Sequence, residues 1–170
     1  MSLKTKIIIV LGGLLLAGGL FIGKKIHKEI IKPTVVVKEV KNQAGEEIIE
    51  VKEPKETIIE KELPMDMNEI DFQQTIHNMS HQKVLAEEKR GAEPLTHDRV
   101  LRLIKIAEKS HYLNKNDYLG ILKRWEANDF SNADNDHNII WNLQDGTVGR
   151  ASGVMSPEQE RQYIDENFKN

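Results

Sequence analysis

The sequence predicts an all-α fold, in which a small globular domain of five helices follows a charged stalk and one transmembrane helix. Three observations support this prediction. Residues 1–32 contain an unbroken apolar run, residues 33–65 are rich in Lys and Glu, and residues 66–170 carry apolar side chains at helical spacing between helix-capping signals. The chain is therefore divided into an N-terminal anchor with basic flanks, a charged spacer that could form a β-hairpin, and a helical C-terminal domain.

The apolar run covers residues 7–23 and contains no charged residue. A helix of this length spans roughly 25 Å, the short end of what a bilayer core requires. A cleaved export signal would be followed by small residues in a polar stretch, whereas Phe21 and Ile22 precede two lysines here, which favours a retained anchor. The flanking lysines favour a cytoplasmic C-terminal side, while the signal-like start favours export. We expect a single-pass protein of the cell membrane with an extracytoplasmic C-terminal domain.

The charge of the chain changes sign along its length. Residues 1–32 are basic, both later segments are acidic, and the 170 residues together carry a net charge of −3. Because binding to a phosphate backbone needs a basic surface, the acidic C-terminal domain argues against a nucleic-acid partner. The chain has no cysteine, which excludes a lipoprotein-type thiol anchor.

The spacer combines β-branched residues with charged ones on both sides of a turn-like cluster around Gly45. This pattern indicates a hairpin of two antiparallel strands. A hairpin without a packing partner is only marginally stable in water, so an extended, solvated spacer is the alternative interpretation.

Apolar spacing predicts the first three helices of the C-terminal domain. The first covers about residues 67–90 and ends at Gly91, a residue that suits the position after a helix end. The second begins after Thr96, which can cap it, and runs to about residue 109. The third covers about residues 116–127, where aromatic and aliphatic residues recur at helical spacing.

Capping signals predict the last two helices. The fourth is expected over about residues 131–146, where Ser131 and Asp134 have the spacing of a capping box. The fifth begins at Ser156, where a proline follows and Gln159 stands three residues later, as in a complete capping box.

Two strings in the C-terminal domain resemble a known family. They are MSHQKVLAEEKRG at residues 79–91 and ADNDHNIIWNLQDGTVGRASGVMSPEQE at residues 133–160. The chain resembles an uncharacterised domain family of membrane-anchored proteins from Bacillus-like Gram-positive bacteria. The resemblance implies the same three-part layout, and it supplies no catalytic residues because the family is catalogued without a function.

Histidines form the first candidate site. His77 and His81 are four residues apart, so they share a helix face and could reach one metal ion, with Asp134, Asp136 and His137 as further ligands. Asn follows the first His, where the zinc-protease pattern needs Glu. Two interpretations remain open: a metal site, or partly buried histidines that are hydrogen-bonded to the protein.

A glycine-rich loop forms the second candidate site. Residues 146–153 read GTVGRASG before a helix start, and Gly146, Gly149 and Arg150 could hold an anion there. The loop lacks both the phosphate-binding lysine motif and the dinucleotide fingerprint, so an ordered interhelical loop is the alternative. Trp141 is either a core residue or, if exposed near the loop, part of a binding surface.

The sequence thus predicts a membrane-tethered helical interaction domain that binds a protein or cell-envelope partner, with the membrane as a further partner. No catalytic set, metal or cofactor is assigned, and an enzyme is the less favoured interpretation. The candidate partner-binding residues are His77, His81, His137, Trp141, Gly146, Gly149 and Arg150. The alternative is a metal-dependent enzyme or metal-binding protein that uses the cluster His77, His81 and His137.

Overall fold

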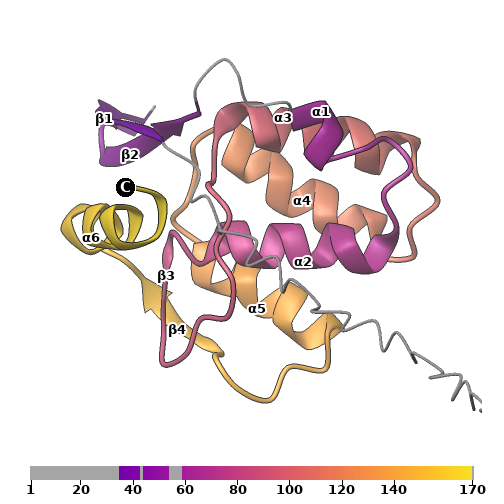
Figure 1. The fold of residues 1–170 in the computed structure, drawn as a ribbon. Coiled ribbons are helices and arrows are strands. Elements are labelled where there is room, and N and C mark those ends of the chain that lie inside the picture. The colour runs from indigo at the N-terminus through magenta and orange to yellow at the C-terminus, as the bar shows by residue number, and fades with distance from the viewer. Residues whose placement is uncertain (1–34, 43, 54–58, 170) are drawn as a thin grey trace, which may run out of the picture. The chain divides into compact units, whose positions relative to one another are not determined.

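The computed structural model describes residues 35–42, 44–53 and 59–169, which lie in the second of two structural units, Ile31–Asn170. Within these residues the chain forms six helices and four short strands (Figure 1). Their order is β1 (Val36–Lys41), β2 (Glu47–Lys52), α1 (Ile59–Glu62), α2 (Glu69–Ser80), β3 (Val84–Ala86), α3 (His97–Lys109), α4 (Lys115–Glu126), α5 (Ala133–Leu143), β4 (Ala151–Val154) and α6 (Pro157–Phe168).

The predicted all-α fold is wrong, because the described chain is a mixed α/β structure. Strands β1 and β2 form one antiparallel sheet, and β3 and β4 form a second one. The first predicted helix, over about residues 67–90, ends as α2 at Ser80. The residues that helical spacing placed further along it pair instead with a distant strand, with Val84 opposite Val154.

The predicted transmembrane helix is also corrected. Of the helices in the described part of the chain, none has both the length and the apolar character needed to cross a membrane. The apolar run at residues 7–23, on which that prediction was based, lies outside the described residues. The cell-membrane location, the extracytoplasmic placement and the membrane partner all depended on that helix, and they are corrected together with it.

The main hydrophobic core lies between α2, α3, α4 and α5. The helices α3 and α4 pack on each other, as do α2 and α5 (Figure 1). The apolar residues that recur at helical spacing in α3 are all buried, namely Val100, Leu103, Ile104 and Ala107. The largest fully buried side chains include Phe72 from α2 and Tyr118 and Trp125 from α4. Packing of the apolar faces of these helices fixes the position of α2 against α5, which matters for the candidate site.

A second, smaller core joins the β1–β2 sheet to α6. It contains Val35, Ile49 and Val51 from the hairpin region and Ile164 and Phe168 from α6. Figure 1 shows the hairpin and α6 side by side. The hairpin indicated by the β-branched residues therefore packs on a helix, which supplies the partner that an isolated hairpin lacks. The division of the chain at residues 32 and 65 stays a prediction.

Capping at the helix N-termini follows the sequence signals at two of the three predicted positions. Thr96 caps α3 by accepting a hydrogen bond from the amide of Arg99, and Ser156 forms a complete capping box with Gln159 at the start of α6. The fourth predicted helix begins later than expected, because Asn132 occupies the N-cap position of α5 without a side-chain hydrogen bond. Ser131 instead bonds to the carboxylate of Asp129 through its amide and its hydroxyl.

Candidate functional site

Three histidines that sequence spacing proposed as a cluster lie together in the structure. His77 lies in the last turn of α2, His81 caps the end of that helix, and His137 lies in α5. One ring nitrogen from each lies within 4.8 Å of the other two, and the ring centroids are 4.5 to 5.4 Å apart. The close packing of α2 on α5 therefore brings together side chains that are up to sixty residues apart in the chain.

Hydrogen bonds orient the two histidines of α2. The Nδ1 atom of His81 donates to the carbonyl oxygen of Gly91 at 2.8 Å, so its Nε2 atom carries the lone pair when the ring is neutral. The Nδ1 atom of His77 is hydrogen-bonded to the side-chain oxygen of Gln144. In both rings the protein holds Nδ1 and leaves Nε2 available, which is the arrangement commonly seen for metal-ligating histidines.

His137 is held through Ser80, a buried residue of α2. The Ser80 hydroxyl lies 2.6 Å from the carbonyl oxygen of His77 and 2.9 Å from Nδ1 of His137. A carbonyl oxygen can only accept, so Nε2 of His137 donates to the carbonyl oxygen of Gly149 at 3.1 Å. The neutral ring then carries its lone pair on Nδ1, which faces the Ser80 hydroxyl.

Burial makes all three histidines weak bases. Removal from water lowers the pKa of His81 to about 3 and that of His137 to about 4, and it lowers the pKa of His77 as well. The positive charge of Lys89 lowers the pKa of His81 and His137 further. The imidazoles are therefore neutral near pH 7, which is the form that binds transition metals.

The spacing of the ring nitrogens is close to that of a tetrahedral metal centre. A zinc ion with Zn–N distances of about 2.0–2.1 Å sets neighbouring nitrogens about 3.3 Å apart. With the observed separations within 4.8 Å, each ring needs to move inward by no more than about 1 Å.

The candidate cluster borders a pocket of about 560 Å³. His77 and His81 line this pocket and contact the fully buried His137, which does not line it. Trp141, Gly146 and Gly149 also line it, so five of the seven residues proposed from the sequence lie on its wall. The histidine cluster and the glycine-rich loop, proposed as separate sites, thus border the same pocket.

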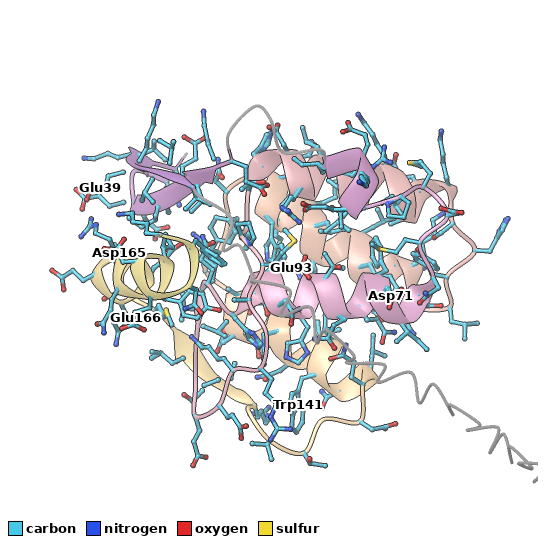
Figure 2. All side chains as sticks on the ribbon, viewed as in Figure 1. Glu39, Asp71, Glu93, Trp141, Asp165 and Glu166 are labelled. Carbon is cyan, nitrogen blue, oxygen red and sulfur yellow. The ribbon has the colours of Figure 1, made fainter. Side chains whose placement is uncertain are left out.

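Trp141 is half-buried and packs against the loop that follows α5. Its Nε1 atom donates to the carbonyl oxygen of Val148 at 2.8 Å, and a Cβ atom at Gly146 would come within 3.0 Å of its ring. Glycine at position 146 therefore lets the backbone approach the indole closely. Figure 2 shows Trp141 on the side of the molecule away from the β1–β2 sheet.

Three polar residues proposed from the sequence lie outside this site. Arg150 is exposed and does not line the pocket. The fully buried Asp136 accepts a hydrogen bond from Trp125 Nε1 at 3.0 Å and pairs with Arg124, so it supports the core. Asp134 does not belong to the cluster of possible ligands.

Sequence reasoning missed three residues that shape the pocket. Gln144 orients His77, while Glu88 and Arg90 line the pocket from the segment after β3 and form an ion pair of 2.6 Å. The charged string EEKR at residues 87–90 was the available signal. Helical spacing predicted that this string lies in the last turn of the first helix, over about residues 67–90.

Comparison with known proteins identifies one family. Residues 76–165, a little over half of the chain, match a family of unknown function (DUF6241), and the chain belongs to this family. Neither the curated proteins nor the solved structures yield a match. The matched segment contains the three histidines, Trp141 and the glycine-rich loop. The bacterial source implied by the sequence resemblance stays a prediction.

Proposed function

We propose that this member of the DUF6241 family binds a divalent transition-metal ion of the zinc type through His77, His81 and His137. One observation carries the proposal: three buried or half-buried imidazoles each place a ring nitrogen within 4.8 Å of the other two. Binding through Nε2 of His137 would replace its hydrogen bond to Gly149, while hydrogen bonds to Gly91 and Gln144 hold Nδ1 of His81 and His77 and leave their Nε2 atoms available. This is the polar support that metal-ligating histidines need.

The kind of ligand decides which metal is expected. All three donors are imidazole nitrogens, which suit zinc, copper, nickel and iron, whereas calcium and magnesium prefer oxygen ligands. No carboxylate of the described residues belongs to the cluster. We therefore expect zinc-type ions to bind and calcium and magnesium to leave the protein unchanged.

Titration of the chelator-treated protein with Zn²⁺ by isothermal calorimetry tests the proposal. The expected result is one ion per chain. His77→Gln and His81→Gln are each expected to weaken binding by roughly 100-fold, since each removes one of three ligands. His97→Gln and His111→Gln replace exposed histidines outside the cluster and serve as matched controls.

Circular dichroism of each variant checks that loss of binding does not reflect unfolding. Of the two ligand positions, His77 is only half-buried, so its replacement is expected to disturb the fold less than that of the buried His81. The proposal fails if the protein takes up no Zn²⁺, or if the ligand and control variants bind it with the same affinity.

A second candidate function is binding of a protein or cell-envelope partner at the same pocket. It is favoured by two apolar side chains on the pocket wall, Ile70 at 77% exposure and Val148 at 52%. Exposed aliphatic residues beside an indole are typical of interaction surfaces. Affinity capture with the full chain as bait tests this candidate, and repeated recovery of no specific partner would count against it.

A further inference from the structure

We propose that the metal ion keeps one coordination position open towards the pocket, and that this position takes the carboxylate of a small organic ligand anchored also by Arg90. The inference rests on the proposed metal binding and adds the class of ligand. Three protein ligands plus one exchangeable position are the usual arrangement of zinc sites that act on other molecules, whereas purely structural sites are closed by four protein ligands.

The position of the histidines gives the direction of the open site. His77 and His81 line the pocket, while His137 is fully buried and reaches the cluster from α5. The buried side of the cluster is filled by Ser80, which is itself fully buried and hydrogen-bonded to His137. The fourth coordination position therefore faces the 560 Å³ pocket, a volume suited to a small organic molecule.

Arg90 supplies a second contact for a carboxylate. It lines the pocket and donates from Nε to Glu88 at 2.6 Å, whereas its two terminal nitrogens make no hydrogen bond with the described residues. A guanidinium with free terminal N–H groups is well suited to bind a carboxylate through two parallel hydrogen bonds. Metal and guanidinium would thus hold the same acidic group.

Charge and wall composition define the ligand further. The charged side chains that line the pocket are Glu88, Asp145 and Arg90, and Lys89 donates to the carbonyl oxygen of His81 at 2.9 Å beside the cluster. With a divalent ion bound, these groups together carry a net positive charge, which favours an anionic ligand. Since Ile70 and Trp141 also line the pocket, the remainder of the ligand is expected to be apolar or aromatic.

The test uses the full chain loaded with Co²⁺, whose visible absorption reports the ligands of the metal, and sodium benzoate as the probe. Benzoate is expected to change the cobalt spectrum in a saturable way. Arg90→Ala is expected to weaken benzoate binding by threefold to tenfold without changing the affinity for Co²⁺. Arg150→Ala, an exposed arginine outside the pocket, is the matched control and is expected to bind benzoate normally.

The possible results separate this inference from the metal proposal. Normal Co²⁺ binding with no spectral response to benzoate overturns the open position alone. Equal benzoate affinity of the metal-free protein overturns the role of the metal, and tighter binding of inorganic phosphate overturns the assignment of a carboxylate ligand. Failure to bind Co²⁺ at all overturns both proposals.

Discussion

Replacing Glu160 with alanine is expected to lower the free energy of unfolding by about 3–5 kcal/mol, because it leaves a buried lysine without its counter-charge. Glu160 lies in the first turn of α6, and its Oε1 atom is 2.6 Å from Nζ of Lys83. The two side chains are only 7% and 3% exposed. Removing one partner from such a pair costs far more than the pair itself contributes.

The surroundings of the pair explain why the lysine cannot turn to solvent. Nζ of Lys83 also donates to the carbonyl oxygen of Ile49 at 3.2 Å and lies 4.0 Å above the ring of Phe130. Burial lowers the pKa of Lys83 and raises that of Glu160, and the attraction between the two charges opposes both shifts. The pair therefore joins β2, the start of β3 and α6 at one buried point.

Urea denaturation of Glu160→Ala and Glu158→Ala measures this effect. Glu158 lies in the same first turn of α6 but is exposed, so its replacement is expected to change stability by less than about 0.5 kcal/mol. The double variant Lys83→Met, Glu160→Leu is expected to be more stable than Glu160→Ala, because no buried charge remains. Equal stability of Glu160→Ala and Glu158→Ala would contradict the assigned role of the pair.

The structural features that the sequence predicts correctly are those that depend on residues close together in the chain. The capping of α3 by Thr96 and the capping box of Ser156 each depend on atoms within one helical turn, and both are present. The inward residues of α3 follow from helical periodicity in the same way. Local hydrogen bonding and side-chain spacing were sufficient to place these helices.

The features missed depend on contacts between distant residues. Val84 and Leu85 have the apolar spacing of a helix, yet their backbone pairs with a strand about seventy residues further along the chain. Nothing in the local sequence favours that pairing over continuation of α2. The strand and the turn before it follow from the packing of the whole domain.

In the candidate site, too, some features depend on local sequence and others on contacts between distant residues. The spacing of His77 and His81 placed both on one helix face, but the position of His137 against them depends on how α2 packs on α5. Arg150 was proposed because it lies in the glycine-rich loop, whereas the arginine on the pocket wall is Arg90, which comes from the opposite loop. Sequence spacing identified the residue types, and tertiary packing decided which of them meet.

Replacing Gly149 with alanine is expected to lower the free energy of unfolding by about 2–5 kcal/mol, because two separate costs add. Gly149 has a φ angle of +83°, in the left-handed region that L side chains rarely adopt. A Cβ atom there would also come within 3.0 Å of the backbone oxygen of Glu88. Since that oxygen belongs to the main chain, the contact can be relieved only by moving the loop after β3 away from the loop before β4.

Gly45 provides a matched control for the cost of placing an alanine in the left-handed backbone conformation. It has the same φ of +83°, but a Cβ atom at this position has no neighbour within 4 Å. Gly45→Ala is therefore expected to cost only about 1–2 kcal/mol, the price of the left-handed conformation alone. Urea denaturation of both variants gives the difference, which measures the packing of the two loops.

The loop contact also supports the histidine cluster, because the carbonyl oxygen of Gly149 faces Nε2 of His137 at 3.1 Å. Asn138, the next residue of α5, holds the adjacent strand by bonding to both the amide and the carbonyl of Ala151. Gly149→Ala is thus expected to weaken Zn²⁺ binding as well as stability, whereas Gly45→Ala leaves metal binding unchanged. Equal losses of stability in the two variants would show that the loops are not in the close contact described.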